Sequence, residues 1–244
     1  MSLPGGRDRR EGQSAPLVLL GTVHCDPDGF VRSLAFFERY QPDLLLVEIS
    51  PLGLKFRKER SPRLHELLLE RVRTASRKLG LDFHTAMAHA HIASILRQIS
   101  LPFEYRAAAA YAEKTGAPLA AVDYSGFSRK WIKTWPQMLS ARNIELLLGM
   151  ENRAVRVCAL YARAARRIYE EDAFFEAGRI DAPLWRRRET LMAGEIAAAL
   201  KRFTPQRPVY IGGWWHLCRG ADIKTIRDLL GIPETSCILL HRAV

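Results

Sequence analysis

The sequence predicts an α/β protein with a central, mostly parallel sheet of about five strands, flanked by helices and carrying a long helical insertion. Two observations predict this fold class. The chain contains short, continuous apolar runs, which are typical of parallel strands buried on both faces, and these runs alternate with segments of helical spacing. The runs cover residues 16–24, 42–48, 118–123, 208–213 and 236–241.

Apolar residues recur at helical spacing between the runs. Gly116 and Gly231 end two of the predicted helices, and Asp82 begins a new helix after a break at Gly80. The strand, helix, strand order over residues 16–48 indicates a βαβ unit with parallel strands. We expect helices at residues 30–40, at 61–100 (two helices), and at 104–115, 136–179, 183–203 and 221–230.

The length of 244 residues is enough to bury a full core, and we expect one domain over residues 16–244 after a flexible tail of residues 1–15. The four cysteines form no Cys-x-x-Cys pair, and no stretch resembles a signal peptide. No apolar run reaches the roughly 20 residues that span a bilayer. We therefore expect reduced thiols, a cytoplasmic location and no transmembrane segment.

The formal net charge of +11 and the pI of about 9.9 favour anionic partners. Many of the arginines lie on segments that look like amphipathic helices, and a solvated helix face accounts for most of them. Because no nucleic-acid-binding motif accompanies the charge, we do not expect nucleic acid as a main partner. We expect a peptide or small-molecule substrate, and the composition leaves a homo-oligomer open.

The tetrapeptide Gly-x-x-His occurs twice, each time where an apolar run ends. Gly21 precedes His24 in the first, and Gly213 precedes His216 in the second. Glu48 ends another run. Because the carboxyl ends of parallel strands share one edge of a sheet, these polar side chains can meet there, and glycine beside them lets backbone or ligand approach closely.

Two imidazoles and a carboxylate are the ligand set of a catalytic zinc site. We therefore predict that His24, Glu48 and His216 bind a divalent metal ion, with zinc, manganese and cobalt as candidates. Extra carboxylates such as Glu104 and Asp123 would shift the preference towards manganese or another harder ion. The bound metal would polarise a carbonyl and activate water for hydrolysis.

A metal-free interpretation also describes hydrolysis. In it His24 is the general base, Glu48 orients it, and Arg188 or His216 stabilises an oxyanion. Structural roles are open as well, because Asp123 can cap the turn after its strand and Glu104 can be a helix N-terminal carboxylate. Glu48 follows so apolar a run that it needs a partner if it is buried.

Three further histidines, His84, His89 and His91, look like a metal cluster but lack an i, i+4 pair. On one continuous helix His89 and His91 point to nearly opposite faces, so we interpret all three as ordinary helix positions. Cys25 and Cys218 lie close in sequence to the two motif histidines. Each could be a thiol nucleophile, a redox switch or only a small buried side chain. The tryptophans that either line a pocket or cover the core are Trp131, Trp135, Trp214 and Trp215.

Together these motifs resemble the TraB/PrgY family, which is related to the TIKI metalloproteases and more distantly to the ChaN and erythromycin-esterase-like proteins. The likeness rests on four blocks in the family's order. They are Leu-Gly-Thr-Val-His at residues 20–24, Pro-Asp-Leu-Leu-Leu-Val-Glu at 42–48, a Glu…Ala…Asp block at 103–123, and Arg-Glu-Thr-Leu-Met at 188–192 with Gly-Trp-Trp-His at 213–216.

The resemblance implies a TIKI/EreA/ChaN-like α/β fold with the site at the sheet edge. It carries over a set of site residues, namely His24, Glu48, Glu104, Arg188 and His216. It also points to divalent-metal dependence and peptide hydrolysis, as in the TIKI relatives. The alternative it allows is a regulatory protein that binds a peptide or small anion without turnover, as in PrgY-type pheromone control.

The chain departs from the family pattern at four positions. The family commonly has arginine where this chain has Tyr124, and Asn or Asp where it has Glu189. Trp214 and Trp215 stand where small residues are usual. The first departure removes a charge-stabilising group, and the tryptophans would narrow the crevice.

Overall fold

The computed structural model describes residues 16–153, 155–170, 182–220 and 223–243, so the predicted tail of residues 1–15 lies outside the described residues. The strands are β1 (Val18–Thr22), β2 (Leu44–Val47), β3 (Leu119–Ala121), β4 (Pro208–Gly213) and β5 (Cys237–Leu239). The α-helices are α1 (Gly29–Tyr40), α2 (Pro51–Lys78), α3 (Phe83–Ala88), α4 (Ala90–Ile99), α5 (Phe103–Thr115), α6 (Ser125–Ile132), α7 (Trp135–Met138), α8 (Ala141–Leu148), α9 (Val157–Ala165), α10 (Ala182–Phe203) and α11 (Ile226–Leu229). The short turns of other helix types are η1 (Arg166–Glu170), η2 (Trp214–Leu217), η3 (Glu234–Ser236) and η4 (Leu240–Arg242).

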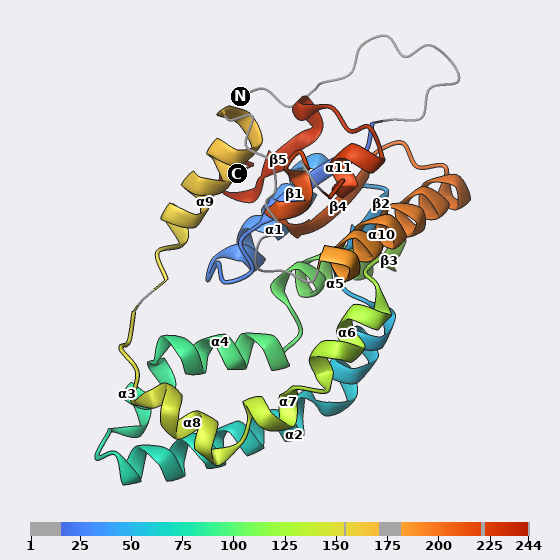
Figure 1. Cartoon of the computed structure of the whole chain (residues 1–244). Helices are drawn as coiled ribbons and strands as arrows, with labels where there is room; N and C mark the ends of the chain where they lie inside the picture. The colour runs from blue at the N-terminus through green and yellow to red at the C-terminus, as the bar shows by residue number, and fades with distance from the viewer. Residues whose placement is uncertain (1–15, 154, 171–181, 221–222, 244) are drawn as a thin grey trace.

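The strands form one sheet, in which every hydrogen-bonded pair within the described residues is parallel (Figure 1). The strand order is β3-β2-β4-β1-β5. Strand β4 comes late in the chain but pairs with both β1 and β2, so it lies at the centre of the sheet. The predicted α/β class and the sheet of about five strands are confirmed, and the sheet is parallel throughout.

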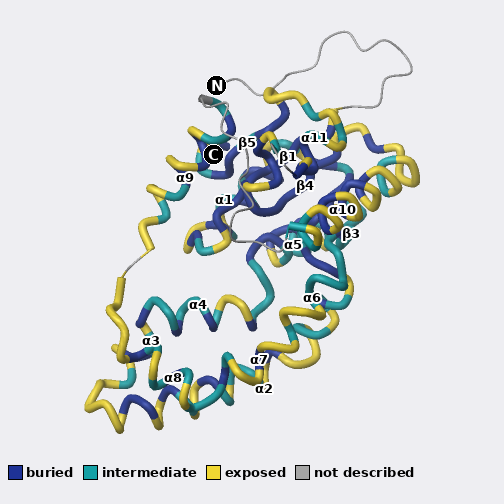
Figure 2. The backbone as a smooth tube through the Cα atoms, viewed as in Figure 1, coloured by how far each residue is buried: buried dark blue, intermediate teal, exposed yellow. Residues whose placement is uncertain are grey.

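Helices cover both faces of the sheet, which explains the continuous apolar runs in the sequence. Every residue of β1, β2 and β4 is buried, as the dark blue tube in Figure 2 shows. Helices α1 and α5 pack together, with the rings of Phe37 and Tyr111 5.7 Å apart, and α10 packs against α11. With the strand order β3-β2-β4-β1-β5, right-handed crossovers are expected to place the first pair on one face of the sheet and the second pair on the other.

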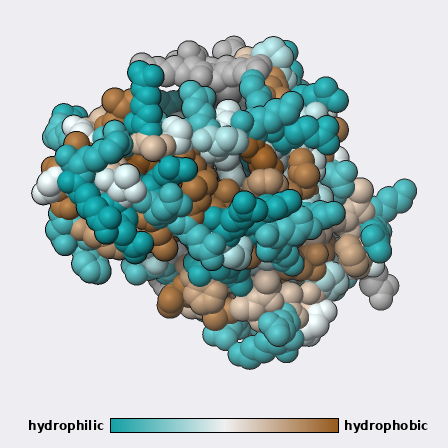
Figure 3. Space-filling view, turned by 90° about the horizontal axis from the view of Figure 1, so that it is seen from below, coloured by the Kyte–Doolittle hydropathy of each residue, from teal (hydrophilic) through white to brown (hydrophobic). Residues whose placement is uncertain are grey.

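A second group of helices lies away from the sheet and matches the predicted helical insertion (Figure 1). We call this group, α2 with α3, α4, α7 and α8, the helical layer. Its side chains form a hydrophobic cluster of their own, with Leu68, Ile92 and Trp135 among the buried members. Viewed from this side, hydrophilic side chains stand in ridges with apolar side chains between them (Figure 3).

Helix α2 begins at Pro51, whereas the sequence analysis started a helix at residue 61. The start signal is Ser50, whose hydroxyl accepts a hydrogen bond from the Gly53 N–H at 2.9 Å, followed by proline in the first turn. The helix then continues past Pro62. The predicted boundary was wrong because the apolar spacing was followed only from residue 61, and the start signal at Ser50 and Pro51 was not used.

The predicted long helix at residues 136–179 was also wrong. Helices α7, α8 and α9 are short and separate, and residues 171–179 lie outside the described residues. Ser140 begins α8 by accepting a hydrogen bond from the Asn143 N–H at 3.3 Å, and Gly149 follows its last turn. Ser140 and Gly149 therefore delimit a short helix within a segment whose apolar spacing alone suggested one long helix.

The last two helix predictions need correction as well. A capping box of Thr225 and Asp228 starts α11 at Ile226, so the helix is shorter than the predicted residues 221–230. The helix after Asp82 breaks at His89 into α3 and α4. Because of this break the rings of His89 and His91 lie 5.4 Å apart and do not point to opposite faces.

No helix in the described part of the chain is long and apolar enough to cross a membrane.

Candidate functional site

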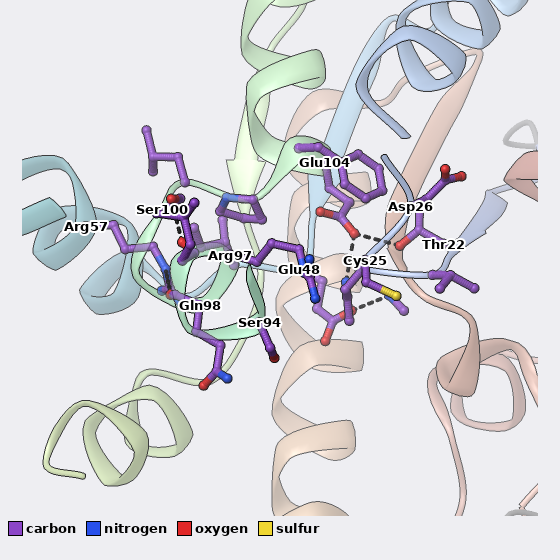
Figure 4. Close-up of a pocket in the computed structure, with 18 of the residues that line it drawn as sticks. Thr22, Cys25, Asp26, Glu48, Arg57, Ser94, Arg97, Gln98, Ser100 and Glu104 are labelled. Carbon is purple, nitrogen blue, oxygen red and sulfur yellow. Dashed lines mark hydrogen bonds and ion pairs between the residues drawn. The ribbon is translucent and has the colours of Figure 1, made fainter. Parts of the chain in front are cut away.

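A cavity of about 1450 Å³ lies between the carboxyl edge of the sheet and the helical layer. Residues from the turns after β1, β2, β3 and β4 line one side, and residues of α2 and α4 line the other. Figure 4 shows Glu48 and Glu104 on one side of the cavity, and Arg57 and Gln98 on the other. The cavity therefore opens directly onto the residues that the sequence analysis singled out.

Four neighbouring strands end in polar residues of interest. Asp123 follows β3, Glu48 follows β2, His216 lies in η2 after β4, and His24 lies in the turn after β1. Along the edge they follow the strand order β3-β2-β4-β1. Residues far apart in the chain thus meet at the carboxyl edge, where parallel α/β sheets place their ligand sites.

The carboxylate of Glu48 is the centre of the cluster. Its Oε1 accepts a hydrogen bond from Nη2 of Arg188 at 2.5 Å and lies 3.1 Å from Nε2 of His216. Its Oε2 accepts a hydrogen bond from the Gly213 N–H at 2.5 Å and lies 3.8 Å from Nε2 of His24. The side chain of Glu48 is 6% exposed, so the partner that a buried carboxylate requires is present several times over.

Glu104 holds the second ring nitrogen of His24. Its Oε1 lies 2.7 Å from Nδ1 of His24 and 2.7 Å from the hydroxyl oxygen of Thr22. Glu104 stands in the first turn of α5 and is buried, and its Oε2 has no hydrogen-bond partner among the described residues. It therefore points into the site and not to solvent.

Glu189 faces the second ring nitrogen of His216 at ion-pair distance, without the hydrogen-bond geometry that joins Glu104 to His24. Its Oε1 lies 2.6 Å from Nδ1 of His216, and its Oε2 accepts a hydrogen bond from the Ile226 N–H at 2.8 Å. Both side chains are buried. The resulting series, which we call the carboxylate–histidine chain, consists of Glu104, His24, Glu48, His216 and Glu189.

Arg188 joins this chain to Asp123. Its Nε and Nη2 donate hydrogen bonds to the two oxygens of Asp123 at 2.7 and 2.9 Å, a bidentate pair. The guanidinium carbon also lies 4.4 Å from the ring centre of Phe127 and 5.0 Å from that of Trp185. Asp123 fills both roles that the sequence left open, because its Oδ1 also accepts a hydrogen bond from the Tyr124 N–H at 2.6 Å.

The carboxylates raise the pKa of both histidines. Desolvation by itself lowers each pKa, but Glu104 and Glu48 outweigh it at His24 and raise its pKa to about 9. Glu189 and Glu48 likewise raise the pKa of His216 to about 10. The side chain of His24 is 60% exposed towards the cavity, so solvent screens its interactions more strongly than those of the buried His216.

Protonated histidines change the metal-free interpretation. The raised pKa of His24 favours a protonated ring, which would serve as an acid better than as the general base of the metal-free interpretation, and the exposure of the side chain weakens this preference. Burial raises the pKa of Glu48, but His216 and Arg188 outweigh this effect and hold it well below its usual value. Glu48 is therefore an ionised carboxylate between cationic partners.

The donor set fits a divalent cation in three respects. Each histidine presents Nε2 to Glu48 while a buried glutamate faces its Nδ1, which is the usual support of metal-ligating histidine. Two imidazole protons carry the same charge as one divalent cation bound by neutral imidazoles. The buried Tyr210 hydroxyl and the Oε2 of Glu104 have no hydrogen-bond partner among the described residues.

No group of three or more His, Cys, Asp or Glu side chains in the described ranges is already arranged to hold a metal ion. At the predicted ligands this reflects direct contacts, since Glu48 reaches His216, Arg188 and the Gly213 N–H itself. Metal binding by His24, Glu48 and His216 would therefore exchange the contact between Glu48 and His216 for two bonds to the ion.

Three residues of the cluster were missed or underrated from the sequence. Glu189 was noted as a departure from the family pattern and not as a site residue, although it follows Arg188 directly on α10 and both are buried. Thr22 occupies a variable position of the first Gly-x-x-His motif, and Tyr210 lies within the apolar strand β4, so neither stood out as a site residue. Two adjacent charged residues on the buried face of a predicted helix are the signal that could have identified Glu189.

The cavity wall also settles where the other candidates lie. All four tryptophans considered above, together with Cys25, line the cavity. Cys218 is buried and is not among the residues that line the cavity, and burial raises the pKa of its thiol to about 12, so of the open alternatives the structure favours a small buried side chain.

Comparison with known proteins gives no match of any kind: no family model, no curated protein and no solved structure is significantly similar to the chain. The likeness to the TraB/PrgY family therefore stays a prediction from the four motif blocks.

Proposed function

We propose that the protein is a hydrolase that depends on a divalent metal ion and cleaves a peptide bond or a related acyl bond in the cavity. One observation carries the proposal: Nε2 of His24 and Nε2 of His216 lie 3.8 and 3.1 Å from the two oxygens of one carboxylate, that of Glu48. Two histidines and a glutamate are a known catalytic zinc set, and they also suit manganese and cobalt.

The remaining members of the carboxylate–histidine chain orient the ligands. Glu104 hydrogen-bonds Nδ1 of His24, which favours the tautomer whose Nε2 is free to bind, and Glu189 places a carboxylate 2.6 Å from Nδ1 of His216 for the same support. A divalent ion held by His24, Glu48 and His216 would polarise the substrate carbonyl and lower the pKa of water. The supporting glutamates also balance the charge of the site.

Arg188 is placed to stabilise the negative charge that develops on a carbonyl oxygen during hydrolysis. Its Nε and Nη2 donate to Asp123 and Glu48, while its Nη1 makes no hydrogen bond in the described residues. The side chain lines the cavity and is fixed between Phe127 and Trp185. A rigid donor of this kind acts most strongly where water is excluded.

The substrate reaches the site from the side of His24. This side chain is 60% exposed towards the cavity, whereas that of His216 is 2% exposed beneath it. His24 is therefore the histidine on the substrate side of the ion, and His216 would bind the ion from the buried side.

A second candidate is a protein that binds a peptide without cleaving it. The observation in its favour is that both oxygens of Glu48 already have close partners in Arg188, His216 and the Gly213 N–H. In that case the cavity would be a recognition site, as in PrgY-type signal control.

Metal content separates the two candidates. The purified protein is stripped with a chelator, reloaded in turn with zinc, manganese and cobalt, and its bound metal is measured beside His24→Ala, His216→Ala and Glu48→Gln. His91→Ala is the matched control, because this histidine lines the same cavity away from the cluster. Stoichiometric metal that is retained by His91→Ala and lost by the other variants supports the hydrolase.

A screen with a library of fluorogenic peptides follows on the loaded protein. Cleavage that disappears in Glu48→Gln, with the circular dichroism spectrum unchanged, supports hydrolysis. Saturable binding of intact peptide with no bound metal selects the second candidate.

A further inference from the structure

The acidic residues that line the cavity all lie on one side of it, whereas cations line both sides. The side at the sheet edge contains all the acidic lining residues, including Glu48, Glu104 and Asp123. The opposite side is formed by α2 and α4 and contains no acidic lining residue. We call this side the basic wall and define it by Arg57, Lys58, His65, His91 and Arg97.

Arg57 is fixed in place without a carboxylate. Its Nε donates a hydrogen bond to the main-chain oxygen of Gln98 at 3.2 Å, and its Nη1 donates to that of Gly53 at 3.3 Å. The guanidinium carbon lies 5.3 Å from the ring centre of Trp135. The described residues give Arg57 no ion pair and no hydrogen bond from Nη2, so this group is left to bind an anion in the cavity.

The surroundings of Arg57 favour such an anion. Burial lowers its pKa, and the distant charge of Asp123 offsets this only in part. A partly buried guanidinium without a counter-charge gains a charge-assisted hydrogen bond when a carboxylate arrives.

Arg97 reaches across the cavity from α4. In Figure 4 its side chain extends from the helix towards Glu48 and Glu104. It is exposed and has no ion pair within the described residues. Lys58 has an aromatic neighbour instead of an acid, since its Nζ lies 5.4 Å from the ring centre of Tyr105.

Other cations of these helices and loops do find acids. Lys78 at the end of α2 lies 2.5 Å from Glu145, and Arg153, which lines the cavity outside the basic wall, lies 2.7 Å from Glu151. Arg57, Lys58 and Arg97 differ from these two in lining the cavity without an ion pair among the described residues.

The cavity has room for a ligand that spans both sides. Its volume of about 1450 Å³ exceeds the roughly 300–1,000 Å³ of ordinary small-molecule sites. An extended peptide can place one bond at the sheet edge while its neighbouring side chains contact α2 and α4.

We propose that the basic wall binds the side-chain carboxylates of an acidic peptide, so that the substrate carries aspartate or glutamate beside the bond at Glu48. The part about the cleaved bond rests on the proposed hydrolase, whereas binding of the acidic peptide does not.

The test is a titration of the full chain with a capped, fluorescently labelled hexaglutamate, with hexaglutamine as the neutral control, at low and at physiological salt. We expect hexaglutamate to bind at least about tenfold more tightly than hexaglutamine. Arg57→Gln and Arg97→Gln should each weaken hexaglutamate binding several-fold. Because Arg57 also joins α2 to α4, the exposed Arg97 carries the test if Arg57→Gln unfolds.

Arg60→Gln is the matched control, since Arg60 lies on the same helix, is exposed and does not line the cavity. General attraction to a chain of net charge +11 would be weakened equally by all three variants, and that result would overturn the proposal. So would equal binding of the two peptides, or binding of a phosphoserine peptide where hexaglutamate does not bind.

The outcome is independent of the proposed hydrolase. Glu48→Gln should keep or strengthen hexaglutamate binding, because it removes a negative charge from the opposite side of the cavity. Binding of the acidic peptide without any bound metal would support the basic wall as a binding site and reject the metal-dependent hydrolase. Metal binding without a preference for hexaglutamate would support the hydrolase and reject the binding role of the basic wall.

Discussion

His24 and His216 approach the two different oxygens of one buried carboxylate, that of Glu48, and each has its other ring nitrogen against a further glutamate. The two Gly-x-x-His motifs thus form the two halves of one chain of charges. A change on one side is felt on the other through Glu48, so substitutions here should not be additive.

Replacing Arg188 should be severe. Arg188→Met leaves the buried carboxylates of Glu48 and Asp123 without their shared cation, which typically lowers the free energy of unfolding by roughly 3–5 kcal/mol. Urea denaturation measures the loss. The neighbouring Arg187 is exposed, so Arg187→Met should change stability by no more than about 0.5 kcal/mol.

A double-mutant cycle tests whether the loss comes from the ion pair. Arg188→Met combined with Asp123→Leu should lose less stability than the sum of the single changes, because one unpaired charge is removed with its partner. Strict additivity would contradict the bidentate pairing.

Glu189 should tune the metal affinity through His216. Glu189→Gln removes the charge that faces Nδ1 of His216, and outer-shell changes of this kind lower metal affinity about 10- to 100-fold. Competition with a fluorescent chelator measures it. Glu195→Gln, at an exposed position on the same helix, should leave the affinity unchanged.

Gly213 should be needed for the position of His24. A Cβ atom at residue 213 would lie 2.8 Å from Nε2 of His24, so Gly213→Ala must displace this ring. Because the ring is largely exposed, we expect lost metal binding with little lost stability. The opposite outcome, a large drop in stability with full metal binding, would contradict the geometry.

Gly194 provides the contrasting glycine. It lies in α10 with no atom within 4 Å of an added Cβ atom, so Gly194→Ala should raise the free energy of unfolding by about 1 kcal/mol. Metal binding should stay the same in this variant.

The stability of the metal-free protein should fall as the pH rises above neutrality. His216 has a folded pKa of about 10 against an ordinary value of 6.5, so its contribution is fully present below about pH 6.5 and is lost as the pH rises through about 10. Urea denaturation after chelator treatment measures the slope. His24→Gln should reduce this slope, because the folded pKa of His24 is also raised.

Bound metal should abolish the fall in stability with pH, since metal-ligating histidines have already released the competing protons. Glu48 acts in the acidic range in the opposite sense. Its pKa is lowered in the folded state, so its contribution is present above its ordinary value of 4.5 and is lost as the pH falls below it.

The sheet and the meeting of the polar residues followed from the sequence because both depend on topology. Short apolar runs separated by helices predict a parallel sheet, and a parallel sheet brings the ends of its strands to one edge. His24, Glu48 and His216 end such runs, so their proximity could be predicted without knowing the strand order. Glu104 and Asp123 could be assigned only as alternatives, because the direction of a side chain at a helix start depends on how that helix docks.

The wrong helix boundaries depend on local capping residues, and the missed site residue depends on how a helix docks. Ser50 and Ser140 start helices by single hydrogen bonds from side chain to backbone, and such caps compete with the apolar spacing that we followed. Glu189 was not assigned, although it follows Arg188 directly, because the residue that it faces depends on how α10 docks. Adjacent residues of a helix point about 100° apart, and here Arg188 and Glu189 reach different members of the same cluster.

The place of β4 has a consequence for the order in which the protein can assemble during synthesis. β4 separates β1 from β2, yet it is made after more than three quarters of the chain, so a ribosome-bound intermediate ending before residue 208 has no strand to join its two earliest ones. Until that strand and η2 emerge, Glu48 has neither the Gly213 N–H nor His216, and its charge stays in water. The addition of β4 to the sheet and the burial of the Glu48 carboxylate with its partners are therefore coupled, and both occur late in synthesis.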